Sequence, residues 1–196
     1  MTGPVTLIET MLWDGAAYPR LALHLARLTA SARAFGLTCD PAAIRAVLPA
    51  PDGAARVRLT LDADGPQVTL GPLPPAAAHW RVALAEARLD SADPWLRHKT
   101  TRRKLYDETR ATLPAGIDEA IFLNERGEVC EGTITNLFFD RGQGMRTPPL
   151  TSGLLPGVLR AELACPEELL SAADLPHVRL WLGNALRGLI PAVWLG

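Results

Sequence analysis

The stretch RVRLTLDADGPQVTLGPLPPAAA, residues 56–78, decides the fold class. Apolar and polar side chains alternate over residues 56–61, a DADG turn follows, and the chain then returns as a second extended run. Alternation on both sides of a Gly-containing turn predicts an antiparallel β-hairpin. The prolines within residues 71–78 cannot continue a helix or a central strand. We therefore place a domain boundary there, between residues 1–78 and residues 79–196.

The part of the chain before this hairpin combines one strand with helices. A strand is predicted over residues 5–11, and a helix over residues 19–35 has an apolar residue at every third or fourth position before Gly36. A second stripe at the same spacing is polar and comprises His24, Arg27 and Ser31. A short helix is predicted over residues 41–48.

The part of the chain after the boundary mixes short strands with two helices. Strands are predicted over residues 80–87, 120–124, 179–183 and 191–195, with one or two more over residues 129–140. Helices are predicted over residues 101–112 and 158–163. Hairpins mixed with helices favour the α+β class over a doubly wound parallel sheet.

The composition excludes several classes of protein. The 196 residues are 48% hydrophobic and 21% charged, which predicts a folded globular chain. A net charge of −1 lacks the basic excess that nucleic-acid binding requires. No apolar run approaches the roughly 20 residues of a membrane-spanning helix. We therefore expect a cytoplasmic protein with no nucleic-acid or membrane partner, and no cluster of histidines and carboxylates indicates a metal.

The distribution of lysine points to a chemical role. Lysine occurs only at Lys99 and Lys104, so that 18 of the 20 basic residues are arginine. Only lysine carries an amine that can lose its proton near neutral pH and attack a carbonyl. In the segment RHKTTRRK, neighbouring cations favour the neutral amine of Lys99, while Arg102 and Arg103 attract an anionic substrate. The alternative is a solvated, charged start of a helix.

Three further segments are candidates for binding. In CEGTITNLFF, residues 130–139, the carboxylate of Glu131 needs a partner if it is buried, and a protonated ring nitrogen is one such partner. In TPPLTSGLLPGVLR, residues 147–160, and LGNALRG, residues 182–188, Gly-rich turns offer backbone N–H groups to an anion. The alternatives are a solvated strand edge for Glu131 and ordinary turns for the other two segments.

Together these segments form an ordered set that resembles the class IV aminotransferases. The resemblance also includes ETMLWDG and HLARLTASARAFG, and it covers nearly the whole chain. This family comprises the fold-type IV pyridoxal-phosphate (PLP) enzymes, among them branched-chain and D-amino-acid aminotransferases and aminodeoxychorismate lyase. The resemblance implies an α+β fold with a small N-terminal α/β domain and a larger C-terminal domain of mixed sheets or a pseudobarrel.

The resemblance also implies a role for individual residues. Lys99 matches the lysine that binds the cofactor covalently and moves the proton, and Glu131 matches the glutamate that bonds the pyridine nitrogen. The remaining matches concern the cofactor phosphate and its surroundings, and they comprise Arg27, Thr135, Asn136, Val158, Leu159, Asn184 and Ala185. Arg102 and Arg103 are the expected substrate-binding residues. Tyr106 is a candidate acid, although an aromatic residue on a helix is more often packed than catalytic.

Two of these positions depart from the family pattern. Leu159 and Ala185 stand where many members have a hydroxyl residue, so that two side-chain contacts to phosphate are missing. Each such hydrogen bond contributes roughly 1.5 to 3 kcal/mol, so we expect weakened cofactor affinity.

The opening LIETMLWDG, HKTTRR and GNALRG are most similar to the short lyases of the family. This likeness implies a 4-amino-4-deoxychorismate lyase of folate synthesis that releases pyruvate and forms 4-aminobenzoate. Transamination of branched-chain or D-amino acids is the first alternative. A non-catalytic protein that binds PLP or another anion is the second. The family further implies a homodimer that acts on a small amino substrate.

Overall fold

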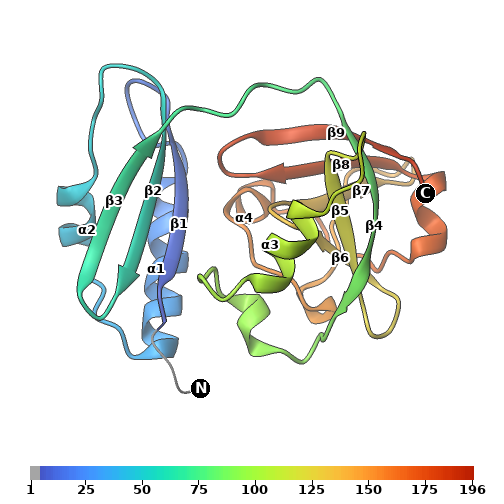
Figure 1. Ribbon diagram of the computed structural model, residues 1–196, viewed down its shortest axis with the longest axis horizontal. Helices are drawn as coiled ribbons and strands as arrows, with labels where there is room; N and C mark the ends of the chain where they lie inside the picture. Colours follow the sequence, from blue (N-terminus) through green and yellow to red (C-terminus); the bar gives the residue numbers. More distant parts are fainter. Residues whose placement is uncertain (1–4) are drawn as a thin grey trace. The chain divides into compact units, whose positions relative to one another are not determined.

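The protein divides into two compact units. The structure is a computed structural model that describes residues 5–196 (Figure 1), so that residues 1–4 of the expected first domain lie outside the described residues. The first unit extends to Pro75 and includes His98–Arg102, and the second unit comprises the rest of the described chain. The boundary falls within the proline-rich segment. The expected division into residues 1–78 and 79–196 does not foresee that His98–Arg102 groups with the first unit.

The first unit contains a three-stranded antiparallel sheet in the order β1-β2-β3. Its elements are β1 (Leu7–Trp13), α1 (Leu21–Phe35), α2 (Pro41–Val47), β2 (Ala55–Asp62) and β3 (Gly65–Gly71). The inward residues of β2 alternate with partly exposed ones, as the sequence pattern predicts, and pack with the apolar stripe of α1 in one core. Gly36 ends α1 in the left-handed region, with φ of 68°, which favours glycine.

The segment His98–Arg102 pairs with β1 along the edge that β2 does not occupy. The Ile8 N–H donates to the carbonyl of Lys99 at 2.8 Å, and the Thr101 N–H donates to the carbonyl of Thr6 at 3.0 Å. These bonds run as in an antiparallel ladder. The backbone of Lys99 is therefore fixed to β1, although it lies far from β1 in the sequence.

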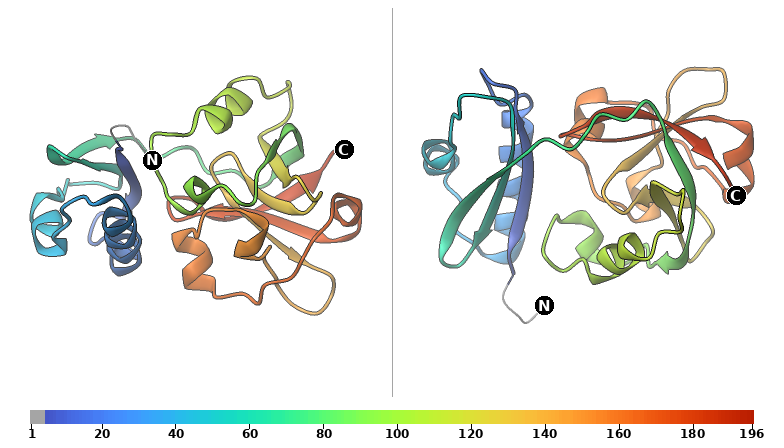
Figure 2. Two further views of the ribbon diagram at one scale, coloured as in Figure 1. Left: turned by 90° about the horizontal axis from the view of Figure 1, so that it is seen from below. Right: turned by 45° about the horizontal axis from the view of Figure 1, so that its top comes forward.

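The second unit is a closed six-stranded barrel (Figures 1 and 2). Its strands are β4 (Trp80–Leu89), β5 (Glu119–Asn124), β6 (Val129–Gly132), β7 (Asn136–Asp140), β8 (Arg179–Asn184) and β9 (Gly188–Trp194). Strand β4 runs parallel to β5 and β9, and the other pairs are antiparallel. This mixed sheet confirms the α+β class and the expected barrel-like domain. Strands β5 and β7 are buried along their whole lengths.

Two helices and three 3-10 segments complete the second unit. They are η1 (Pro94–Arg97), α3 (Lys104–Ala111), η2 (Leu150–Ser152), α4 (Val158–Leu163) and η3 (Ala172–His177). Helix α4 has the predicted bounds, whereas α3 begins three residues later than predicted because Thr101 is engaged in pairing with β1. No helix among residues 5–196 is both long and apolar enough to cross a membrane.

Candidate functional site

The polar stripe of α1 binds a buried carboxylate on β1. Glu9, which is 2% exposed, accepts hydrogen bonds from Arg27 Nε at 2.8 Å and Arg27 Nη2 at 2.6 Å. His24 Nδ1 lies 2.6 Å from Glu9 Oε2. Burial alone raises the pKa of Glu9, but the charge of Arg27 and the hydrogen bonds from His24 and Arg27 outweigh it and lower the pKa to about 2. The guanidinium of Arg27 is therefore held by a fixed anion.

His24 brings a second feature to this cluster. Its Nε2 atom is buried and has no hydrogen-bond partner among the described residues. A buried polar nitrogen without a partner is costly to the folded protein. The cluster thus retains one buried nitrogen that no group in the described part of the chain satisfies.

The last polar residue of the stripe, Ser31, holds the residue that precedes Lys99. Ser31 Oγ and His98 Nδ1 lie 3.0 Å apart, and the ring of Phe35 meets the His98 ring edge-on at 4.8 Å between centroids. Burial lowers the pKa of His98. Lys99 itself is half-buried, and β1 fixes its backbone. Arg102, expected to bind substrate, is exposed at the end of this segment.

In the second unit, Glu131 on β6 is buried and accepts hydrogen bonds on both carboxylate oxygens. Tyr106 Oη donates to Oε1 at 2.8 Å. Oε2 accepts from the Leu155 N–H at 3.1 Å and from Asn136 Nδ2 at 3.4 Å. Glu131 is 6% exposed, so that its carboxylate is buried and has the partners that burial requires. The alternative of a solvated strand edge is wrong.

A polar face of α3 attaches this helix to the chain around Glu131. Arg103, Tyr106 and Arg110 recur at helical spacing and so share one face. Arg103 Nη2 donates to the carbonyl of Thr133 at 3.0 Å, while its Nε bonds Asp107. Arg110 Nη1 donates to Thr133 Oγ1 at 3.1 Å. The guanidinium of Arg103, expected to bind substrate, is thus engaged with protein groups.

A second buried carboxylate, Glu119, fixes the turn between β6 and β7. It is fully buried and accepts from the N–H groups of Thr133 and Ile134 at 3.1 and 3.2 Å. Thr135 Oγ1, expected near the cofactor, donates to Glu119 at 3.2 Å, and Arg110 lies 3.3 Å from the same carboxylate. The hydroxyl of Thr135 therefore serves to hold the turn.

Two glycine-containing turns carry the residues expected at the phosphate. Among residues 5–196, no side chain caps the start of α4, where the first-turn N–H groups lack helical partners. A Cβ added to Gly157 would overlap the amide oxygen of Asn136, and one added to Gly183 would lie 2.6 Å from a methyl group of Leu159. Leu159 therefore packs onto the turn that Asn184 begins. The two turns are adjacent, and Leu159 contributes apolar packing there in place of a hydroxyl.

The second of these turns is held by a side-chain amide. Asn184 Oδ1 accepts from the N–H groups of Leu186 and Arg187 at 3.1 and 3.0 Å, and its Nδ2 donates to the carbonyl of Ile134 at 3.1 Å. Ala185, which follows, is buried. Asn184 thus shapes the turn with its side chain.

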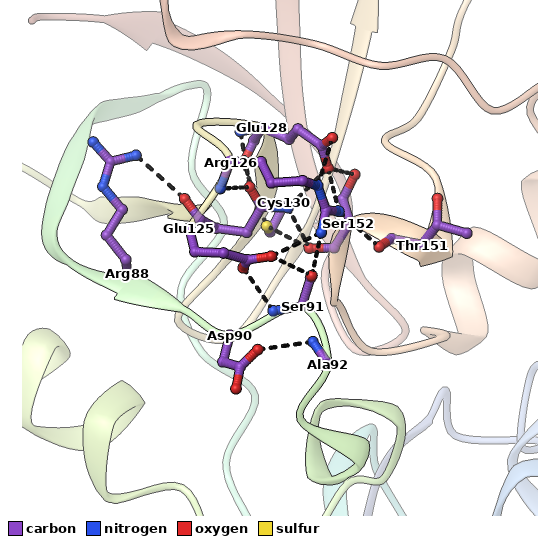
Figure 3. Close-up of polar contacts among 11 residues, drawn as sticks. Arg88, Asp90, Ser91, Ala92, Glu125, Arg126, Glu128, Cys130, Thr151 and Ser152 are labelled. Atoms are coloured by element: carbon purple, nitrogen blue, oxygen red, sulfur yellow. Dashed lines mark hydrogen bonds and ion pairs between the residues drawn. The ribbon is translucent and has the colours of Figure 1, made fainter.

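A polar network fixes the start of the loop that leads to α4 (Figure 3). Ser152 is fully buried, and its hydroxyl donates to Glu128 at 2.9 Å. Its carbonyl accepts from Asn124 Nδ2 at 2.9 Å and from the thiol of Cys130 at 3.2 Å. The hydrogen bond from Arg126 to Glu128 is the main cause that lowers the pKa of Glu128 to about 2. The loop is thereby anchored to β6 at both ends, to Cys130 at Ser152 and to Glu131 at Leu155.

Sequence reasoning missed two carboxylates of these clusters. Glu9 lies in a strand, and its only signal was the polar stripe of α1, which needs an acidic partner. Glu119 follows Asp118 before an apolar run, a pattern that indicates an exposed turn. The structure brings Glu131 together with Asn136, and Leu159 together with the turn of Asn184. The roles of these residues toward a cofactor stay predictions.

Comparisons with known proteins agree with this architecture. The family model described as amino-transferase class IV matches residues 6–193. The chain is 31% identical over 170 residues to the "Putative aminodeoxychorismate lyase" of Schizosaccharomyces pombe, covering 80% of this chain and 72% of that protein. It is 50% identical over 42 residues to the aminodeoxychorismate lyase of Bacillus subtilis, a stretch that spans 21% of this chain and only 14% of that relative.

Among solved structures, the chain is similar to one from Mesorhizobium loti that is described as a "Putative amino-acid aminotransferase". The sequence identity is 46%, and the TM-score is 0.92. The match covers 97% of this chain and all of that one, 100%. The two chains therefore share the fold over nearly their whole lengths.

Proposed function

We propose a function from one premise, which is that this chain belongs to the class IV aminotransferase family. Members of this family depend on PLP. The proposed activity is that of a 4-amino-4-deoxychorismate lyase, which releases pyruvate and forms 4-aminobenzoate for folate synthesis. The lyase relatives and the sequence motifs at LIETMLWDG, HKTTRR and GNALRG support this activity.

The observation that carries the proposal is the buried carboxylate of Glu131 with hydrogen-bond donors on both oxygens. Such donors favour the ionised form, which suits a protonated pyridine nitrogen. In the first unit, Arg27 provides a permanent cation that suits a phosphate, and Glu9 orients it. The donors around Glu131 are what binding of a pyridinium nitrogen requires, and Arg27 is what binding of a phosphate requires.

The mechanism assigns three tasks to the chain's own residues. Lys99 would form and release a covalent bond to the cofactor aldehyde, and its freed amine would remove the proton from the substrate carbon that bears the amino group. Glu131 would hold the ring nitrogen protonated. When bound, the cofactor supplies an electron sink for the charge that develops at this carbon. The substrate's C–O bond to the enolpyruvyl group would break, the released enolpyruvate would take up a proton to become pyruvate, and the substrate's ring, having lost a proton and the enolpyruvyl group, would become the aromatic ring of 4-aminobenzoate.

The covalent step has a direct test with a matched control. Borohydride reduction of the protein with PLP should fix the cofactor on the Lys99 peptide, as located by mass spectrometry. The Lys99→Ala variant should carry none, while Lys104→Ala should be labelled like the unmodified protein because that side chain is exposed on α3. Labelling that persists in Lys99→Ala contradicts the proposal.

The reaction itself is tested with the substrate alone. Aminodeoxychorismate without any keto acid should yield 4-aminobenzoate and pyruvate over many turnovers. Absence of these products, together with turnover of an amino acid with a keto acid, favours the transaminase. The likeness to the Mesorhizobium loti structure is the observation that supports this second candidate.

Two further parts of the proposal concern the state of the protein. The apolar contact of Leu159 with Gly183 and the methyl group of Ala185 would make phosphate binding depend on backbone N–H groups and Arg27. A non-catalytic PLP-binding protein is the outcome if the cofactor binds without turnover.

The proposal also includes a cytoplasmic homodimer, for which sedimentation should give a mass twice the 21.1 kDa of the chain.

A further inference from the structure

Tyr106 and the loop before α4 donate to different oxygens of the Glu131 carboxylate. Its hydroxyl lies 2.8 Å from Oε1, whereas Leu155 and Asn136 donate to Oε2. Hydrogen bonds to both oxygens leave the carboxylate little freedom to rotate. The phenol of Tyr106 donates directly to Oε1, so that it helps to fix the orientation of that oxygen.

The phenol is the donor in this contact. Burial, followed by the charge of the neighbouring Glu131, raises the pKa of Tyr106 far above its ordinary value. The hydroxyl therefore keeps its proton at any physiological pH. A neutral donor that faces a carboxylate forms a charge-assisted hydrogen bond, which favours the ionised form of the carboxyl group.

The position of Tyr106 does not depend on Glu131 alone. Its ring meets the fully buried ring of Phe122 edge-on, with 5.0 Å between centroids and 63° between planes. The guanidinium of Arg103 lies over the Tyr106 ring, 5.7 Å from its centroid. Because Arg103 also bonds the carbonyl of Thr133, helix α3 is attached to the chain just after Glu131. The phenol is thus preorganised.

We propose that Tyr106 is a positioning residue that keeps the Glu131 carboxylate oriented and ionised toward the ring nitrogen of the cofactor, an inference that rests on the proposed function. It acts through Glu131 and needs no contact with substrate. The competing explanation is that Tyr106 only packs α3 against Phe122. If Tyr106 positions Glu131, loss of the hydroxyl weakens only the contact to the ring nitrogen. If Tyr106 only packs, its loss changes the binding of PLP and of an analogue without that nitrogen equally.

The test compares PLP with its analogue in which a C–H group replaces the ring nitrogen. Equilibrium dialysis gives the affinity of the full chain for each ligand. The affinity for PLP divided by the affinity for the analogue reports the contribution of the contact to the ring nitrogen. We expect Tyr106→Phe to lower this ratio on the order of tenfold, which is the effect of one lost charge-assisted hydrogen bond. On a Glu131→Gln background, the same substitution should leave the ratio unchanged.

The chain offers a matched control in its other tyrosine. Tyr18 donates its hydroxyl to the carbonyl of Pro49 in the first unit, so that Tyr18→Phe removes a phenol hydrogen bond away from Glu131 and should leave the ratio unchanged. With only two tyrosines present, a Tyr18→Phe chain made with fluorotyrosine carries the label at position 106 alone. The more acidic phenol is a stronger donor, and it should raise the ratio without any loss of packing.

Each outcome separates the two proposals. If the wild-type chain binds no PLP, the proposed function fails and this inference fails with it. If the wild-type chain binds PLP but Tyr106→Phe weakens both ligands equally, or neither, Tyr106 has only a packing role and the inference alone is overturned. The fluorotyrosine protein keeps the test decisive where Tyr106→Phe folds poorly, because an unchanged ratio there also overturns it.

Discussion

Glu9 is the residue on which the polar cluster of the first unit depends. Replacing it by glutamine leaves Arg27 and His24 without their buried counter-charge. We expect Glu9→Gln to lower the free energy of unfolding at pH 7 by about 3 kcal/mol, as measured by urea denaturation. Glu86→Gln, which removes an exposed carboxylate, should change it by less than about 0.5 kcal/mol. Equal effects would contradict the assigned role.

The same carboxylate predicts a pH dependence with a definite sign. The pKa of Glu9 is about 2 in the folded protein and 4.5 ordinarily. The stabilisation is therefore complete above the ordinary value and is lost as the pH falls from about 4.5 toward 2. The urea midpoint of the wild-type chain should fall more steeply over this window than that of Glu9→Gln. Parallel profiles of the two proteins would exclude Glu9 as the source.

Individual residues mark the limit of what the sequence predicts. The helical spacing of His24 and Arg27 indicated that they share a face, because spacing follows from helix geometry. It did not identify Glu9, because pairing between α1 and β1 is tertiary. Likewise, the apolar neighbours of Glu131 in the sequence indicate its burial, whereas its donor Tyr106 lies on another element, and the sequence offers it only as a candidate acid or a packed aromatic residue.

At the scale of elements, the start of α4 depends on a close contact. A methyl group at Gly157 would overlap the side chain of Asn136, whose amide donates to Leu155. Gly157→Ala should lower the free energy of unfolding by about 1 to 3 kcal/mol. Gly53→Ala, where the described chain has no neighbouring atom within 4 Å of the added carbon, should be neutral or slightly stabilising. Urea denaturation of both variants checks this, and equal stabilities would rule out the contact.

The elements themselves followed from the sequence to a large extent. The hairpin of β2 and β3 and the short helix α4 have strong local signals, in alternation, turn residues and Gly-rich starts. The segment η3 did not, because its 3-10 geometry leaves no long-range periodicity to detect. The delayed start of α3 has a tertiary cause, since Thr101 pairs with β1 and is not available to the helix.

At the scale of the molecule, the first unit is completed by a segment from beyond the proline-rich linker. A fragment of residues 1–78 lacks the hydrogen bonds that join Ile8 to Lys99 and Thr101 to Thr6. Hydrogen exchange at the Ile8 amide should be at least about tenfold faster in this fragment than in the whole chain. Joining residues 98–102 to the fragment through a flexible linker should restore protection. Full protection in the shorter fragment would contradict this account.

The prolines in the sequence indicate where the first unit ends, but no local signal indicates that a later segment also belongs to it. Prolines near Pro75 mark where the backbone leaves the first sheet, and the division falls there. The return of His98–Arg102 to β1 is a non-local pairing, and the charged residues of that segment indicated a helix start instead. Strand pairing across such a separation has no signature in spacing.

The scarcity of lysine makes this protein suited to chemical footprinting. Lys99 is half-buried with its backbone on β1, whereas the Lys104 side chain is 87% exposed and forms only a surface pair with Glu108. An amine-acylating reagent thus meets two side-chain amines in contrasting surroundings. Lys104 serves as an internal reference, and the ratio of the two modified peptides in one mass spectrum would report how strongly its surroundings protect the Lys99 amine from the reagent.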